Sequence, residues 1–168
     1  MTTDESSPSR AELLDALHTS GRRVLQRIRT IDPALLEEGR YEGGWNGRQI
    51  LAHMASIEWT YPRILDLPEA DEKATAATGD SQGASQSNPM DGYNERQVAQ
   101  RAEASVADLL AEFEANRAKT IAAVETADAA VLSRRVATAG GRTGTIAQVL
   151  SDVAVRHVLG HLEDLSPR

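Results

Sequence analysis

Four stretches of the chain carry apolar residues at the three- and four-residue spacing that gives a helix one buried face. Each stretch opens with a polar residue followed three positions later by Glu or Gln, a pair that caps the free backbone amides at a helix start. The four pairs are Ser9 and Glu12, Asn46 and Gln49, Asn94 and Gln97, and Thr145 and Gln148. The pattern predicts an all-α protein with four helices.

Prolines and apolar runs set the expected bounds of these helices. The first covers about residues 11–30 and ends before Pro33, and the second begins after Trp45 and contains Pro62, which kinks or ends it. The third covers about residues 95–127 and the fourth about 146–165. The buried face of the first helix is expected to consist of Leu14, Leu17, Gly21, Val24, Leu25 and Ile28.

Residues 66–93 are expected to form a long connecting segment, because they are rich in Ala, Ser, Gly, Asp and Gln. A helix of about 20 residues is about 30 Å long, and an extended connection of more than ~20 residues can return along it. The second and third helices are therefore expected to run parallel, joined by a crossover. The connection before the fourth helix contains the turn-rich run 139–144, which could hold a short extended pair.

The length of 168 residues suits one domain with its own hydrophobic core. Residues 1–168 are expected to form a single four-helix bundle, with residues 1–8 as a disordered tail. The chain begins with polar and acidic residues and has no apolar run of the ~18 residues that a membrane span needs. A cytoplasmic protein without a membrane partner is the expectation.

Composition narrows the possible chemistry. The formal net charge of −7 argues against nucleic acid as a partner, because phosphate backbones attract basic surfaces. The chain has no cysteine and therefore no disulfide, no thiolate ligand and no cysteine nucleophile. Any thiol chemistry needs a thiol supplied by a cosubstrate.

The positions of the four histidines along the chain indicate which of them point into the bundle. His157 and His161 lie four residues apart on the fourth predicted helix, so their side chains share one face. That face continues the apolar stripe through Leu150 and Val153 and therefore points inward. His53 follows Ile50 by three residues on the second helix and points inward as well.

A metal site explains three inward histidines better than core packing does. A lone inward histidine is more often an ordinary core residue, and a His-x-x-x-His pair also arises by chance. Three buried imidazoles, however, each carry a nitrogen that needs a partner, and one divalent ion satisfies all three. We therefore predict that His53, His157 and His161 bind one ion with an open coordination position, with zinc, nickel, manganese and iron all acceptable.

Several other side chains could either support the metal site or be ordinary surface and core residues. His18, beside Leu17 on the first helix, is a candidate fourth ligand or acid-base group. Carboxylates that could orient an imidazole are Asp152, Asp164 and Glu58. Trp45 and Trp59 wall a pocket or pack in the core. Arginines that could hold an anionic substrate, or lie on solvated helix faces, are Arg48, Arg101 and Arg156.

Two segments around the histidines resemble a known family. Residues 44–53, Gly-Trp-Asn-Gly-Arg-Gln-Ile-Leu-Ala-His, and residues 156–162, Arg-His-Val-Leu-Gly-His-Leu, are similar to the DinB-like or YfiT-like superfamily of metal-dependent enzymes. That superfamily also includes the metal-binding domain of mycothiol-dependent maleylpyruvate isomerase. The resemblance implies a four-helix bundle with up-down-down-up topology and a metal triad of His53, His157 and His161. The isomerase branch has a glutamate in place of His157 and an extra domain, which argues against the isomerase reaction.

The resemblance also implies the kind of activity. Members are described as transferases or isomerases that use small thiols such as mycothiol or bacillithiol, or as hydrolases. The leading hypothesis is an enzyme acting on a small-molecule substrate through a water or thiolate held by the metal. The alternatives are a non-catalytic, metal-stabilised bundle that acts as a stress-linked binding or scaffold protein, and partner binding through residues 66–93. A homodimer formed through helix faces is a further expectation.

Overall fold

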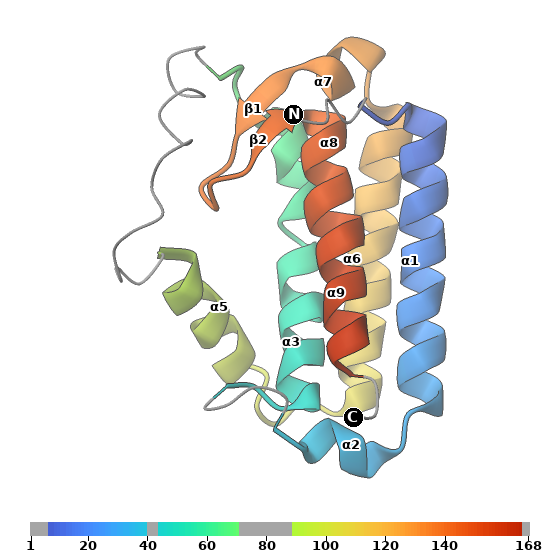
Figure 1. Ribbon diagram of the computed structural model, residues 1–168, viewed down its shortest axis with the longest axis vertical. Coiled ribbons are helices and arrows are strands. Elements are labelled where there is room, and N and C mark those ends of the chain that lie inside the picture. The colour runs from blue at the N-terminus through green and yellow to red at the C-terminus, as the bar shows by residue number, and fades with distance from the viewer. Residues whose placement is uncertain (1–6, 40–43, 71–88, 166–168) are drawn as a thin grey trace, which may run out of the picture.

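The computed structural model describes residues 7–39, 44–70 and 89–165, and in these residues the protein is a four-helix bundle. Figure 1 shows α1 and the column of α8 and α9 running one way, while α3 and α6 run the other. The all-α prediction is confirmed. The four columns of the bundle are α1 (Arg10–Thr30), α3 (Gly47–Glu58), α6 (Val106–Thr126), and a fourth made of α8 (Ile146–Leu150), η2 (Ser151–Arg156) and α9 (His157–Asp164).

Three of the four predicted cap pairs form as expected. Ser9, Asn46 and Thr145 each accept a hydrogen bond from the backbone three residues on, and the side chain there binds back to the cap amide. These reciprocal bonds satisfy amides that have no partner within the helix. Local sequence therefore fixes the start of the columns that carry the histidines.

The fourth predicted cap pair, Asn94 with Gln97, is wrong. Asn94 lies inside α5 (Pro89–Ala99), and the predicted third helix is interrupted before α6 begins. Ser105 caps α6 instead, accepting from the backbone amide of Asp108 at 3.1 Å. The side chain of Arg48 donates to the carbonyls of Ala102 and Ala104, which supplies partners to the backbone where the helix is broken.

Short elements close the two ends of the bundle. They are α2 (Pro33–Glu37), the 3-10 helix η1 (Tyr61–Asp66), α7 (Ala129–Ser133), β1 (Arg135–Ala137) and β2 (Thr143–Thr145). Pro33 opens α2, and Pro62 lies in the first turn of η1, where a missing amide costs nothing. The strands pair antiparallel, which confirms the predicted extended pair, and Gly141 supplies the positive φ of 80° in their turn.

Two sequence expectations fall partly outside the described residues. These are residues 1–6 of the expected tail and residues 71–88 of the expected connection. The last five residues of that connection, 89–93, belong to α5. Within the described part of the chain, no helix is both long and apolar enough to cross a membrane.

The buried face of α1 differs slightly from the prediction. Leu13 and Ser20 are buried, whereas Leu14 and Leu25 are half-buried at its edge. The buried positions are spaced by three and four residues, from Leu13 through Leu17 and Ser20 to Val24. Ser20 was missed because it is polar, and it is buried because a buried arginine of α6 binds its hydroxyl.

Close packing at the start of α3 gives the first testable prediction. A Cβ at Gly47 would lie 2.9 Å from the Cα of Leu36 and 3.1 Å from the carbonyl oxygen of Leu35, so α2 would have to move. Gly47→Ala is expected to lower the free energy of unfolding by about 1–3 kcal/mol, measured by urea denaturation.

Gly160 provides the matched control for that substitution. It lies in α9, and among the described residues no atom beyond its chain neighbours and its own helix backbone comes within 4 Å of an added Cβ. Gly160→Ala is expected to raise the free energy of unfolding by about 0.5–1 kcal/mol through helix propensity alone. Equal stabilities of the two variants would contradict the close approach of α2 to α3.

Candidate metal centre

The three predicted ligands come together from two columns of the bundle. His53 lies in the middle of α3 and is 2% exposed, because α3 is buried along the whole run from Ile50 to Glu58. His157 opens α9, and His161 follows one turn later on the same face. Both are partly buried. The structure thus places all three predicted histidines in one cluster.

The distances within the cluster suit a single ion. Nε2 of His53 lies 3.2 Å from Nε2 of His157, and one nitrogen from each ring lies within 4.8 Å of the others. A tetrahedral zinc ion with Zn–N bonds of about 2.0–2.1 Å separates its ligand nitrogens by about 3.3 Å. Small side-chain rotations would bring the three nitrogens to that spacing.

Several buried nitrogens in the cluster find no hydrogen-bond partner among the described residues. They are Nδ1 of His53 and both ring nitrogens of His161. Nδ1 of His161 lies 3.4 Å from Oδ2 of Asp164, which is long for a hydrogen bond. Buried polar atoms of this kind cost free energy unless something binds them. A divalent cation would bind them, so the donor set fits a metal ion.

The protonation state of the cluster also suits metal binding. Burial lowers the pKa of His53 to about 3, and the neighbouring His161 and His157 add to the effect. Burial, followed by His161 and Arg142, lowers the pKa of His157 to about 4. Burial lowers the pKa of His161 too, although Asp164 opposes it. All three rings are therefore neutral at pH 7, the form that binds metals.

The other residues predicted near the ligands have varied surroundings. Asp164 lies beside His161, whereas Asp152 pairs with Arg156 and Glu58 with Arg117. The ring of Trp45 packs against His53, with 5.0 Å between centroids. His18 is exposed on α1 and is not among the three clustered histidines.

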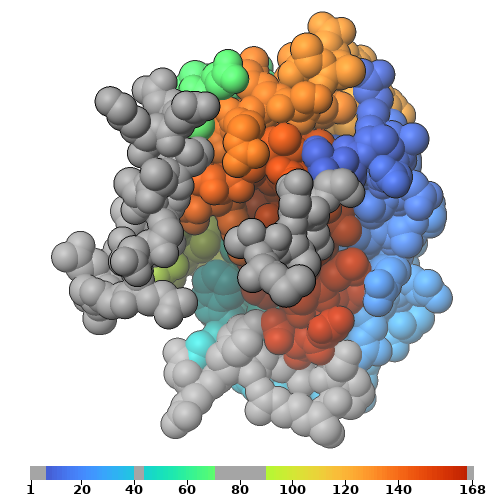
Figure 2. All heavy atoms as spheres, turned by 45° about the horizontal axis from the view of Figure 1, so that its top comes forward, coloured from blue at the N-terminus to red at the C-terminus, as the bar shows by residue number. Residues whose placement is uncertain are grey.

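A cavity of about 550 Å³ adjoins the cluster, and His53 and His157 belong to its wall. In Figure 2 the surface is hollowed beside the orange residues of the hairpin, with α5 and α3 set back behind them. Most of the remaining wall is apolar or aromatic. It includes Ile57, Trp59, Tyr61, Ile64, Leu67, Met90, Tyr93 and Val153. A small molecule held there would lie against two of the three imidazoles.

The cationic residues of the cavity are not those that sequence patterns suggested. Arg101 pairs with Glu112. Arg48 and Arg156 also bind other protein groups. The cavity is instead lined by Arg63, which stacks 3.9 Å over the ring of Trp59, and by Arg142 of the hairpin turn. Their only sequence signal was nearness to Trp59 and to the turn-rich run 139–144.

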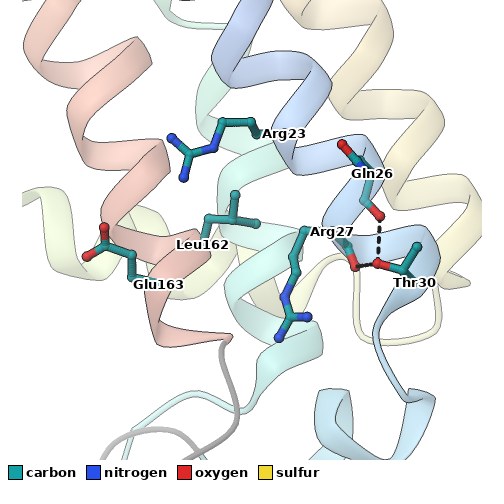
Figure 3. Close-up of a pocket in the computed structure, with 6 residues that line it drawn as sticks. All are labelled: Arg23, Gln26, Arg27, Thr30, Leu162 and Glu163. Atoms are coloured by element: carbon teal, nitrogen blue, oxygen red, sulfur yellow. Dashed lines mark hydrogen bonds between the residues drawn. The ribbon is translucent and has the colours of Figure 1, made fainter.

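A second hollow of about 300 Å³ lies between α1 and α9 and serves as a comparison. Figure 3 shows Arg23 and Arg27 from α1 facing it, with Leu162 and Glu163 from α9. No imidazole lines it, and the hydroxyl of Thr30 donates back to the carbonyls of its own helix. This hollow is a polar groove between two helices, and its single carboxylate, Glu163, belongs to no group of three metal-ligating side chains among the described residues.

Fold and site together define a class of protein, a four-helix bundle that gathers one histidine from α3 and a His-x-x-x-His pair from α9. The chain belongs to the DinB superfamily, whose sequence profile matches residues 16–165. The resemblance drawn from the two histidine segments is therefore confirmed.

Two solved structures have a similar fold. The mycothiol-dependent maleylpyruvate isomerase superposes with a TM-score of 0.70 at 19% identity, over 95% of this chain and 61% of that chain. YfiT from Bacillus subtilis, described as a probable metal-dependent hydrolase with an unusual four-helix bundle topology, superposes with a TM-score of 0.57 at 18% identity, over 98% of this chain and 89% of that chain. This chain spans about three fifths of the isomerase. No curated protein matches the sequence.

Proposed function

We propose that the protein is a metal-dependent enzyme in which His53, His157 and His161 bind one divalent cation and the adjoining cavity holds a small-molecule substrate. The observation that carries this proposal is the position of His53 and His157 in both the cluster and the cavity wall. A structural metal site is closed by protein ligands, whereas three ligands leave a position for a reactant. The two neighbours named above, an isomerase and a protein described as a probable metal-dependent hydrolase, support an enzymatic role.

The first candidate activity is that of a transferase or isomerase that uses a small thiol, and the second is that of a hydrolase. When bound, the cation supplies a Lewis acid that lowers the pKa of a thiol or water in its remaining position. The chain has no cysteine, so the thiol arrives as a cosubstrate. The apolar part of the cavity wall offers a surface for an apolar group of the partner molecule.

Turnover with simple reagents tests the proposal. Metal-loaded protein is incubated with N-acetylcysteine and monobromobimane, and separately with p-nitrophenyl acetate. In the first reaction a carbon–sulfur bond forms as bromide leaves, and in the second water cleaves the ester. A rate that requires the metal is the expected result in one of the two assays. Metal binding without turnover in either assay would favour the non-catalytic scaffold.

The cavity also predicts what kind of molecule binds. Its wall is mostly apolar, and its charged residues are Arg63, Arg142 and one carboxylate, Asp91, which leaves an excess of positive charge. We propose an apolar ligand with an anionic group, and 1-anilinonaphthalene-8-sulfonate is a fluorescent probe of that kind. Arg142→Gln is expected to weaken its binding about threefold, since exposed charge pairs contribute up to ~1 kcal/mol. Titration of the probe fluorescence measures the change.

Two controls make that measurement specific. Arg135→Gln removes an exposed arginine of the same hairpin that does not line the cavity, and it should leave probe binding unchanged. N-phenyl-1-naphthylamine lacks the sulfonate, so Arg142→Gln should not affect its affinity. Equal weakening of both probes would show that the arginine shapes the cavity and does not recognise charge.

A further inference from the structure

The helix that carries His157 and His161 is interrupted immediately before them. In η2 (Ser151–Arg156) the hydrogen bonds span five residues, and the amide of His157 donates to the carbonyl of Asp152. Such π-helical turns are rare, and they insert one extra residue between two α-helical stretches. One residue corresponds to about 100° of rotation on an α-helix, so this turn sets the direction in which α9 points its histidines.

A buried arginine of α6 binds this turn. Arg117 is 4% exposed, and its Nη2 donates to the carbonyl of Ala154 at 2.7 Å. Its Nη1 donates to the carbonyl of Leu17 at 3.2 Å and to the hydroxyl of Ser20 at 3.0 Å. One guanidinium therefore holds both the π-helical turn and the middle of α1.

The same guanidinium binds a buried carboxylate of α3. Nε and Nη2 of Arg117 lie 2.8 and 2.9 Å from the two oxygens of Glu58, which is completely buried. The hydroxyl of Thr120 donates to the same carboxylate at 3.2 Å. Glu58 follows His53 by five residues, and Ala154 precedes His157 by three. The pair thus connects the two elements that carry the three ligands.

Stability alone is a poor explanation for this pair. Moving two charges out of water costs several kcal/mol, and apolar replacements of buried pairs are often neutral or stabilising. Burial raises the pKa of Glu58, a sign of that cost, although Arg117 limits the rise. The best-attested benefit of buried polar groups is that they select one packing register between helices over the alternative registers.

We propose that Arg117, paired with Glu58, is a positioning residue for the metal centre: it holds the π-helical turn at Ala154 and so fixes the direction of His157 and His161 relative to His53. The inference rests on the proposed metal site. It predicts that the pair affects the affinity and geometry of metal binding far more than it affects folding.

The test replaces the whole pair and measures cobalt binding. Glu58→Leu with Arg117→Met leaves no unpaired buried charge, and Co²⁺ gives visible absorption bands that report coordination geometry. We expect the melting temperature to stay close to that of the wild type. Cobalt affinity, from competition with a chelator, should fall at least tenfold, which is within the range found when groups that orient ligands are lost. The intensity or position of the bands should also change.

A second, partly exposed ion pair provides the control. Nη2 of Arg101 lies 2.6 Å from Oε1 of Glu112, and neither residue belongs to the histidine cluster. Arg101→Met with Glu112→Leu should leave cobalt affinity and spectrum unchanged. Unchanged values in the Glu58 and Arg117 double variant would overturn the positioning role.

Two further outcomes are distinguishable. If the double variant fails to fold, Arg117→Lys decides the question, because lysine keeps the charge but cannot reach Glu58, Ala154 and Leu17 together. Lysine should weaken cobalt binding and alter the spectrum, and an unaltered variant would overturn the inference. If the wild type binds no Co²⁺, the proposed function fails first, and the positioning role fails with it.

Discussion

Replacing His157 with alanine is expected to abolish metal binding. Wild-type protein purified without a histidine tag should contain about one divalent ion per chain, as a three-histidine site implies. His157→Ala removes a ligand whose Nε2 lies 3.2 Å from that of His53, and two imidazoles hold an ion far more weakly than three. We expect the variant to retain less than about a tenth of the wild-type metal after dialysis, measured by mass spectrometry.

His18→Ala is the control for this loss. His18 is exposed on α1 and is not part of the cluster, so its removal should leave the metal content unchanged. Retention of the ion by His157→Ala would contradict the assignment of ligands. Failure of the wild type to bind zinc, nickel or manganese would contradict the site itself and leave the histidines as core residues.

The histidine cluster was predictable because its signals are local. The spacing of His157 and His161 puts two imidazoles on one helix face, and apolar neighbours show which way each face points. Helix caps are equally local, since a single side chain and the backbone three residues on complete them. The same logic failed at Asn94, because Ser105 and Asp108 form an equally local cap pair further along the chain. The sequence does not mark the break between the two helices, where Arg48 donates to the carbonyls of Ala102 and Ala104.

The cavity and the supporting network were not predictable, because their residues meet only in the folded chain. Arg117 lies on the buried face of α6 between Phe113 and Thr120, where its charge suggests an exposed position. Its partner Glu58 is 59 residues away, and nothing in the sequence marks the π-helical turn that both residues help to hold. Tertiary contacts thus decide how the predicted ligands are oriented.

Acid is expected to destabilise the metal-free protein through the same histidines. The pKa of His53 is about 3 in the folded protein, against an ordinary value of 6.5, so the unfolded chain binds a proton that the folded protein excludes. Protonation of His53 therefore leaves the free energy of unfolding intact above pH 6.5 and lowers it as the pH falls toward 3. Between pH 6.5 and 4.5 the loss from this one group is about 2–3 kcal/mol.

Comparison with His53→Leu isolates this contribution. Glu58 acts in the opposite direction, because its raised pKa makes the folded state gain a proton as the pH falls. Subtracting the leucine variant removes that effect and all others that both proteins share. Urea denaturation with EDTA at pH 6.5, 5.5 and 4.5, followed by tryptophan fluorescence, measures the difference.

As the pH is lowered, the free energy of unfolding is expected to fall more steeply in the wild type than in His53→Leu. The control His18→Leu should show the same fall as the wild type. Parallel curves for the wild type and His53→Leu would show that the ring of His53 is already accessible to protons in the folded state. Such access would contradict the burial of the His53 side chain, which is 2% exposed. The acid response of the metal-free protein therefore tests the ligand environment independently of any metal.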